Sequence, residues 1–159
     1  MIRIFALVIV LTASFGCAQR GVAIHEKPDI SISQKEKWDL MVGKWLGNAV
    51  TERGDARRWL VQRFEDGTYQ IDFVLHKKDG AVEKSSEVGQ WAISGPVYFT
   101  SFRGWLRGSS LSPSDPSDPY NYDAYKIRQL DNLVFEYEHI ETGAVFKVTR
   151  VPSNFLLGN

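Results

Sequence analysis

The side chains most able to perform acid–base or metal chemistry are scattered in this sequence. The three histidines are His25, His76 and His139, and none has metal-ligand spacing to a cysteine, aspartate or glutamate. No serine nucleophile elbow, phosphate loop or dinucleotide fingerprint occurs. His139 follows Tyr137 at an alternate position, which favours a hydrogen-bonded interior residue over a catalytic base. We therefore expect no catalytic residue, no metal and no cofactor, and a binding protein rather than an enzyme.

Three arginines fall within strand-like runs, and their orientation decides what they do. These are Arg63, Arg103 and Arg128. An arginine that faces an apolar cavity can hold the carboxylate or phosphate of a ligand, whereas one that faces solvent has no contact with the ligand. The sequence leaves both orientations open for each of them.

The segment 107–121 is long for a connection and contains several Ser, Pro and Asp residues. Asp115, Asp118 and Asp123 lack the regular spacing and the turn glycine of calcium loops, so a solvated loop or a lid is favoured over a calcium site. Aromatic residues lie at both roots of the segment and form either a cavity rim or ordinary strand core: Phe102, Trp105, Tyr120, Tyr122 and Tyr125.

The N-terminus has the pattern of an export signal. Arg3 precedes an apolar run over 4–11, and small residues lead to Cys17, the only cysteine. Ser14-Phe15-Gly16-Cys17 resembles the bacterial lipobox, in which cleavage before the cysteine is followed by its lipidation, with palmitate-type acyl chains. Residues 1–16 are then the lipoprotein signal and Cys17 attaches the chain to a membrane. The alternative is cleavage after Ala18, which removes Cys17 and leaves a soluble periplasmic or secreted protein.

Residues 17–33 carry the cysteine and a segment without sustained periodicity, which we interpret as a tether. Ser33 and Glu36 fit a capping box, so a short helix is predicted over 34–42. This helix can cover an open end of a barrel, or it is simply an irregular lead-in. Residues 152–159 form a C-terminal tail.

After residue 43 the sequence predicts an all-β domain over 43–151. Turn signals recur about every 12 residues, and they include Asp66-Gly67 and Asp79-Gly80, which are typical of hairpins. An up-and-down meander of about eight antiparallel strands would close into a barrel, because closure removes exposed edges. The predicted strands are 44–52, 56–65, 68–77, 81–93, 96–106, 122–130, 133–140 and 144–151.

Alternation assigns the inward face of some strands only. Tyr69, Ile71 and Phe73 share one face of their strand, opposite polar residues. The run 96–106 is apolar on both faces, so its orientation is ambiguous.

Gly43-Lys44-Trp45 resembles the opening of lipocalins and their wider relatives, the calycins. The resemblance implies that Trp45 plugs the closed end of the barrel, and that Arg150, late in the last strand, packs across it. A guanidinium on an indole face is worth about 1–2 kcal/mol when sheltered. It also implies a ligand cavity, for which the candidate lining residues are Phe102, Arg103, Trp105, Tyr122, Tyr125, Tyr137 and His139.

The charge balance and the aromatic content of the sequence restrict the classes of ligand that we expect. Lys+Arg and Asp+Glu number 19 each, so the sequence does not indicate nucleic-acid binding. Aromatic residues make up 13%, which suits an apolar cavity. We expect an exported, lipocalin-like barrel that binds a small hydrophobic ligand such as a fatty acid. We expect it to be an outer-membrane lipoprotein that faces the periplasm. A packed interaction module of the cell envelope and an enzyme in a calycin-like cavity are the alternatives, and the sequence does not address oligomeric state.

Overall fold

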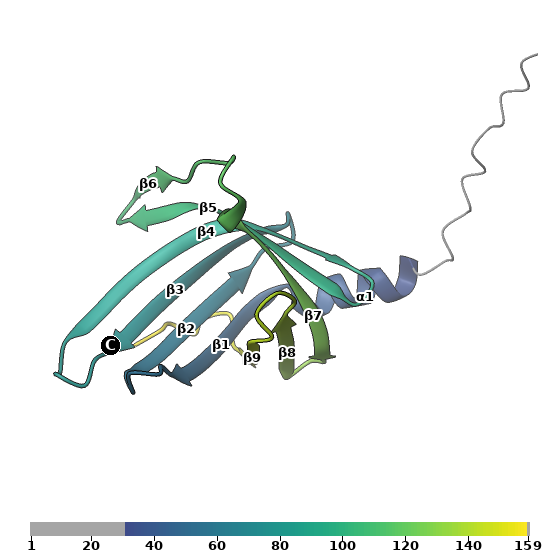
Figure 1. Cartoon of the computed structure of the whole chain (residues 1–159). Helices are drawn as coiled ribbons and strands as arrows, with labels where there is room; N and C mark the ends of the chain where they lie inside the picture. The colour runs from purple at the N-terminus through teal and green to yellow at the C-terminus, as the bar shows by residue number, and fades with distance from the viewer. Residues whose placement is uncertain (1–30, 159) are drawn as a thin grey trace, which may run out of the picture.

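The computed structural model describes residues 31–158, with side chains from residue 34 onward. The expected signal, Cys17 and most of the tether lie outside these residues. The described chain consists of one helix, one short 3-10 helix and nine strands (Figure 1). The elements are α1 (Ser31–Met41), β1 (Gly43–Val50), β2 (Ala56–Arg63), β3 (Thr68–His76), β4 (Val82–Ser94), β5 (Val97–Arg107), β6 (Ser110–Pro113), η1 (Pro119–Asn121), β7 (Tyr122–Leu130), β8 (Val134–His139) and β9 (Val145–Val151).

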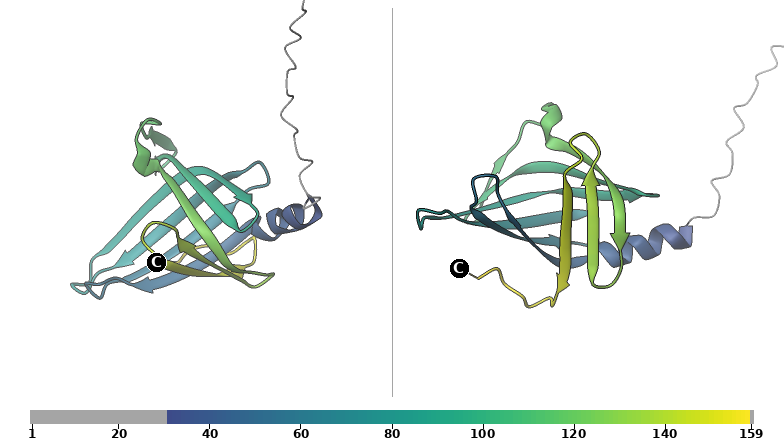
Figure 2. Two further views of the ribbon diagram at one scale, coloured as in Figure 1. Left: turned by 45° about the vertical axis from the view of Figure 1, so that its right-hand side comes forward. Right: turned by 60° about the horizontal axis from the view of Figure 1, so that its bottom comes forward.

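Eight of these strands form a closed antiparallel barrel, as the sequence predicted. The hydrogen-bonded order is β1-β2-β3-β4-β5-β7-β8-β9, and β9 returns to pair with β1. β6 is an extra strand that pairs with β5 outside this ring. Figure 2 shows the curved sheet from two further sides. Within residues 31–158, no helix has the length and apolar character needed to cross a membrane.

The tight turns fall where the sequence placed them. Gly67 and Gly80 follow aspartates in the β2–β3 and β3–β4 hairpins, with φ angles of 83° and 89°. Residues other than glycine rarely adopt this backbone conformation, which is why the Asp-Gly pairs were informative. The turns fix the register of both hairpins.

A β-bulge resolves the ambiguous strand 97–107. The register between β4 and β5 shifts at Val88/Gly89, so that Arg103 has no partner of its own across the ladder. Tyr98, Thr100 and Phe102 face the interior before the bulge, and Trp105 faces it afterwards. One extra residue exchanges the two faces of a strand, which explains why the sequence is apolar on both.

The long connection 107–121 is ordered and is not one irregular loop. Its first part forms β6, and Ser114 then donates backbone and side-chain hydrogen bonds to the carbonyls of Arg103 and Phe102. The carboxylate of Asp115 accepts from Ser117, and that of Asp118 caps η1 through the Tyr120 N–H. These two aspartates therefore stabilise turns of the segment.

Helix α1 covers one end of the barrel, the closed end (Figure 1). Trp38 stacks on Trp91 with ring centroids 4.1 Å apart, and the side chains of Gln34 and Lys37 donate to carbonyls at the β4–β5 turn. The helix begins at Ser31, so Ser33 lies inside it and is not the N-cap residue that the sequence suggested.

Trp45 is fully buried beneath α1 and donates to the Met41 carbonyl. The Arg150 guanidinium lies 4.2 Å from the Trp45 ring centroid, which is the contact that the sequence predicted. The same guanidinium donates to the carbonyls of Leu40, Val42 and Asn132. Arg150 therefore ties the last strand to the helix and to the first strand.

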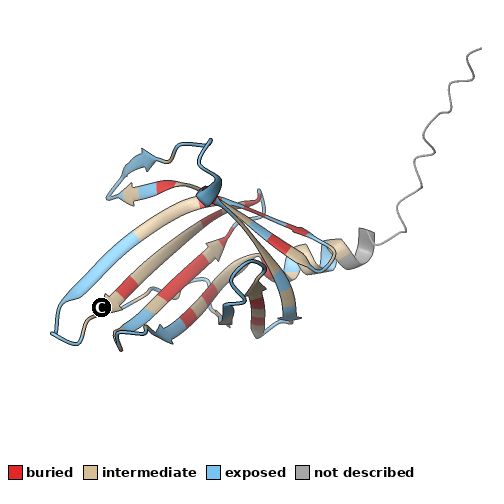
Figure 3. Ribbon diagram, viewed as in Figure 1, coloured by how far each residue is buried: buried red, intermediate tan, exposed pale blue. Residues whose placement is uncertain are grey.

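The most deeply buried side chains gather toward this closed end. Met41, Trp45, Phe135 and Val148 are completely buried. Figure 3 shows buried positions along the middle strands and exposed ones at the tips of the hairpins. The packed core thus occupies only part of the barrel, and the rest is available for a site.

Candidate functional site

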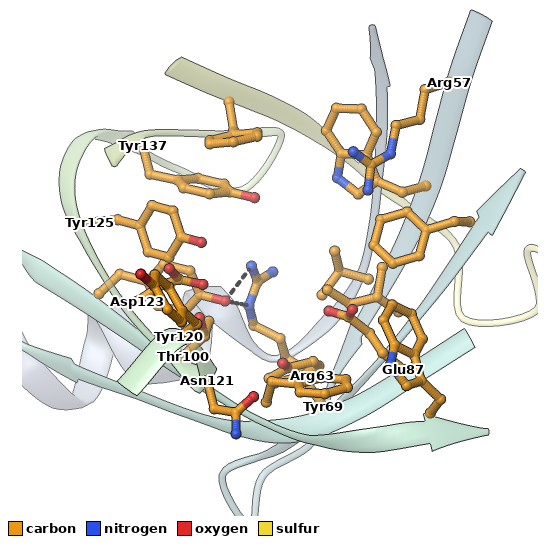
Figure 4. Close-up of a pocket in the computed structure, with 18 residues that line it drawn as sticks. Arg57, Arg63, Tyr69, Glu87, Thr100, Tyr120, Asn121, Asp123, Tyr125 and Tyr137 are labelled. Atoms are coloured by element: carbon orange, nitrogen blue, oxygen red, sulfur yellow. Dashed lines mark hydrogen bonds between the residues drawn. The ribbon is translucent and has the colours of Figure 1, made fainter. Parts of the chain in front are cut away.

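A cavity of about 480 Å³ lies inside the barrel, above the packed core. Figure 4 shows its labelled side chains directed toward a common space, with Tyr125 and Tyr137 on one side and Arg57 and Glu87 on the other. Its lining consists of Arg57, Trp59, Val61, Arg63, Tyr69, Ile71, Phe73, Glu87, Tyr98, Thr100, Phe102, Trp105, Tyr120, Asn121, Asp123, Tyr125, Tyr137 and Phe146.

Strand alternation places these side chains. Every second residue of β2 from Arg57 to Arg63 faces inward, and Tyr69, Ile71 and Phe73 do the same from β3. Glycine makes room where large rings meet the neighbouring strand. A Cβ at Gly47 would lie 2.1 Å from the Trp59 ring, so the indole lies directly over that backbone.

Aromatic contacts make the wall on the β7–β8 side. The Tyr98 and Tyr125 rings stack at 5.4 Å, and Tyr137 meets Tyr125 edge-on at 5.1 Å. Phe102 and Trp105 form a second edge-on pair at 5.1 Å. Trp105 and Tyr120 are exposed, so they mark the side on which the cavity meets solvent.

Arg63 is the most unusual group in the cavity, because only 1% of the residue is exposed to solvent. Its Nε and Nη2 atoms donate to the Tyr98 hydroxyl at 3.2 and 3.0 Å. Its guanidinium carbon lies 4.9 Å from the Tyr98 ring centroid and 5.2 Å from that of Phe135. Nη1 is buried and has no hydrogen-bond partner among the described residues.

Two carboxyl groups, Glu87 and Asp123, also face the cavity. Burial raises the pKa of Glu87 to about 7, with Asp123 acting in the same direction and Arg57 opposing it. Asp123 Oδ1 accepts a hydrogen bond from His139 Nε2 at 3.1 Å. Glu87 therefore changes its charge near neutral pH.

The cavity tyrosines remain neutral hydrogen-bonding groups. Burial raises the pKa of Tyr69, Tyr98, Tyr125 and Tyr137, and the nearby Arg63 guanidinium opposes this for Tyr98 and Tyr137. A phenol that keeps its proton can donate to a ligand oxygen as well as accept. The lining thus combines apolar rings with hydroxyl donors at their edges.

The sequence-predicted cavity residues divide into two groups. Phe102, Trp105, Tyr125 and Tyr137 line the cavity. Arg103, Tyr122 and His139 are not among its lining residues, and each has another partner. Arg103 donates to Gln90 and lies against Tyr122, whose hydroxyl in turn donates to the Pro116 carbonyl.

His139 sits beside the cavity and contacts its wall. Thr142 N–H donates to Nδ1, so Nε2 carries the proton of a neutral ring and donates to Asp123. The ring meets Tyr125 edge-on at 5.2 Å. His139 therefore orients two lining residues and is not itself exposed to the cavity.

Two β-bulges explain why Arg103 and Arg128 do not line the cavity. Arg103 is the extra residue of β5, and Arg128 is the extra residue of β7, where the register shifts between Ile127 and Gln129. Arg128 forms an ion pair with Glu138 on the outside, with Nη2 and Oε2 2.6 Å apart. Of the three arginines singled out from the sequence, only Arg63 lines the cavity.

Several lining residues were not predicted, although strand alternation in the sequence indicated some of them. Trp59 and Val61 alternate with Arg57 and Arg63 along β2, and Glu87 lies two residues before Gly89 on β4. Strict alternation from Trp59 would have found the β2 residues. No sequence signal identifies Glu87 as half-buried, because polar residues precede it over 83–86. Among the described residues, no group of three or more His, Cys, Asp or Glu is placed to hold a metal ion.

Comparison with known proteins gives a similarity to solved structures but to no family model or curated protein. Among solved structures, the chain is similar to a lipocalin-like protein from Bacteroides uniformis ATCC 8492. The match has 16% identity and a TM-score of 0.42, and it covers 70% of this chain and 99% of the other.

Proposed function

We propose that this protein is an exported, membrane-anchored barrel that binds one small, largely apolar molecule, such as a fatty acid or a lipid fragment. The observation that carries the proposal is the cavity of about 480 Å³ with its aromatic lining. Ligand sites commonly have volumes of about 300–1,000 Å³ and apolar walls with a few polar groups. Barrels of about eight strands either fill with side chains or hold one small ligand, and this one has unfilled space.

Export and anchoring are supported by the sequence. The apolar run over 4–11 and the lipobox-like Ser14-Phe15-Gly16-Cys17 favour a lipidated Cys17. Ala18 rather than Asp follows the cysteine, which by resemblance to enterobacterial sorting favours the outer membrane, facing the periplasm. Acyl chains contribute about 0.8 kcal/mol per buried CH₂, so more than one chain holds a protein firmly on a bilayer.

The direct test is native mass spectrometry of residues 18–159, which lack the proposed lipid anchor, purified without detergent and followed by organic extraction of anything bound. We expect a discrete added mass that extracts into the organic phase and is lost on delipidation. Incubation of the delipidated protein with fatty acids or lysolipids should restore a 1:1 complex. A bare protein mass that none of these molecules changes would contradict the proposal.

An interaction module of the envelope is the second candidate, because a groove is also present on the outside. It has a volume of about 510 Å³ and lies beside α1, where Phe99 and Tyr122 are exposed on β5 and β7. A protein that stays bare in the mass spectrometric test, yet co-purifies with a defined envelope protein, would favour this candidate. Substituting Phe99 and Tyr122 should then abolish the association.

A further inference from the structure

We propose that Arg63 and Tyr98 form a head-group site for a single carboxylate, and that the ligand is an anionic amphiphile bound with its head toward the closed end of the barrel. This inference rests on the proposed ligand-binding function and names its ligand class. It depends on the position and the hydrogen bonds of one buried guanidinium.

The first step is the charge of Arg63. Arginine keeps its proton in proteins, so a residue that is 1% exposed carries a buried positive charge. None of the carboxylates among the described residues lies within ion-pair distance of it. A buried charge without a counter-ion is costly, and the faces of Tyr98 and Phe135 offset only part of that cost.

The second step is the set of donors that remain free. Arg63 Nη1 is buried and makes no hydrogen bond of good geometry among the described residues, and the Tyr137 hydroxyl lies beside the same guanidinium. The Tyr98 hydroxyl accepts from both Nε and Nη2, so its own proton is left for a third group. Burial keeps this hydroxyl neutral by raising its pKa. A guanidinium N–H and a phenol O–H side by side suit the two oxygens of one carboxylate.

The third step is the orientation of the ligand. Arg63 is the last residue of β2 and pairs with Gly43 at the start of β1, which places its backbone at the closed end. The apolar lining residues extend away from it along the barrel toward Trp105 and Tyr120, which are exposed. A ligand with its head at Arg63 therefore lays its tail against Ile71, Phe73 and Phe102, toward the solvent side.

The fourth step favours a carboxylate over a doubly charged phosphate. Glu87 and Asp123 face the same cavity, and only one guanidinium is fully buried in it. A second negative charge on the head group would have no buried cation of its own and would be repelled by these carboxyl groups. One unpaired guanidinium balances one carboxylate.

The test compares three probes that share one tail: decanoate, decan-1-ol and decyl phosphate. Binding to the delipidated protein is followed through the fluorescence of Trp59 and Trp105, which line the cavity. We expect decanoate to bind at least tenfold more tightly than either decan-1-ol or decyl phosphate. Arg63→Met should remove the preference for decanoate over decan-1-ol. Arg58→Met is the matched control, because Arg58 lies on the outward face of β2, the strand that also carries Arg63, and is absent from the cavity lining. It should retain the preference.

Each outcome is decisive. Equal affinities for decanoate and decan-1-ol in the unmodified protein would overturn the head-group site and leave the proposed function intact. Tighter binding of decyl phosphate would overturn the carboxylate assignment, and a preference that persists in folded Arg63→Met would overturn the role of Arg63. Binding of none of the three probes would refute the proposed function itself and the inference with it.

A second measurement needs no variant, in case Arg63→Met does not fold. The carbonyl carbon of ¹³C-labelled decanoate is titrated by NMR in complex with the unmodified protein. Beside the Arg63 guanidinium, the bound carboxylate should keep its charge to lower pH than free decanoate does. A bound titration midpoint above that of free decanoate would show that the carboxylate lies in an apolar region away from Arg63.

Discussion

At the scale of single residues, two arginines show how similar surroundings lead to different roles. Arg63 and Arg150 both lie against aromatic faces inside the barrel. Arg150 donates to three backbone carbonyls, whereas Arg63 has one nitrogen without a partner. The first therefore serves the structure of the closed end, and the second is free to serve a ligand.

Arg150→Gln should destabilise the fold by about 2–4 kcal/mol. The change removes the cation–π contact with Trp45, worth about 1–2 kcal/mol when sheltered, and leaves carbonyls of Leu40 and Val42 without their donor. Arg150→Lys should lie between Gln and the native residue, since one ammonium cannot reach all three carbonyls. Urea unfolding measures the difference, with Arg53→Gln in an exposed turn as the control. A loss no larger than in the control would show that Arg150 does not hold the closed end.

Glu87→Gln should alter the pH dependence of stability. The pKa of Glu87 is about 7 in the folded chain and near 4.5 when unfolded, so the folded state binds more protons between these values. Stability from this residue is present below about pH 4.5 and is lost as the pH rises to about 7. Each tenfold change in proton affinity is worth about 1.4 kcal/mol, and partial solvation reduces the total to about 1–3 kcal/mol.

Urea unfolding at pH 5 and pH 8 tests this expectation. Glu87→Gln should be more stable than the native protein at pH 8 and closer to it at pH 5. Glu141→Gln, on the exposed β8–β9 turn, should leave the pH dependence unchanged. An identical pH dependence in native protein and Glu87→Gln would mean that Glu87 is solvated in the folded chain.

At the scale of elements, the sequence was most informative where the backbone obeys a simple period. Hairpins at Asp66-Gly67 and Asp79-Gly80 and the inward set of Tyr69, Ile71 and Phe73 could be predicted, because turn chemistry and alternation are local. The faces of β5 and β7 could not be assigned past their bulges. A bulge residue such as Arg103 or Arg128 has no signal in the local sequence, because pairing with the neighbouring strand determines the position of the bulge.

The segment 107–121 shows the same limit. Its Ser, Pro and Asp content suggested a solvated loop or a lid, yet β6 forms because β5 continues beyond its pairing with β7 and offers a free edge. The Asn121 side chain is then buried by its hydrogen bond to the Asp115 carbonyl. Pairing with the free edge of β5 and hydrogen bonds within the segment order it and bring Tyr120 and Asn121 to the cavity.

Gly104→Ala should uncouple this segment from the barrel. Gly104 has a φ of 151°, and a Cβ there would lie 2.4 Å from the Ser112 carbonyl oxygen on β6. Strained backbone of this kind costs about 1–3 kcal/mol, and the nearest atoms are backbone, which cannot simply rotate away. We expect loss of amide hydrogen-exchange protection in β6 and a several-fold weaker complex with any cavity ligand.

Gly108→Ala provides the comparison, because a Cβ at Gly108 meets no atom within 4 Å although its φ is also positive. It should show the cost of backbone strain without the steric conflict at β6. Equal hydrogen-exchange protection of β6 in Gly104→Ala and Gly108→Ala would mean that the close approach to Ser112 is not what holds the hairpin.

At the scale of the whole molecule, the barrel has two ends with separate tasks. The closed end contains α1, Trp45 and Arg150 and is packed with buried side chains. The cavity lies beyond it and meets solvent near Trp105 and Tyr120. Stability and ligand binding should therefore respond to different substitutions.

Trp38→Ala tests this division. It removes the stack on Trp91 and a large part of the contact between α1 and the barrel, at a cost of about 2–4 kcal/mol for a partly buried aromatic side chain. Trp91 fluorescence should shift to longer wavelength as the ring meets solvent. Ligand affinity, measured well below the unfolding transition, should change less than twofold. A large loss of affinity in folded protein would show that the two ends are coupled.

The position of α1 also bears on the proposed anchor. The chain reaches the barrel through α1 at the closed end, so a lipid on Cys17 would attach the protein from that side and leave the cavity unchanged. Cys17→Ala should therefore move the protein from the membrane fraction to the soluble fraction of cells, because the acyl chains supply the membrane affinity. The ligand affinity of the released protein should equal that of the delipidated native protein.

Cell fractionation, combined with the intact mass of the purified protein, distinguishes the outcomes. Lipidation at Cys17 predicts an N-terminal mass with added acyl groups in the native protein and none in Cys17→Ala. Native protein found soluble, with a mass that begins after Ala18, would instead establish ordinary cleavage and remove the anchor from the proposal. Because the cavity depends only on residues of the barrel and of η1, the ligand-binding function would survive that result.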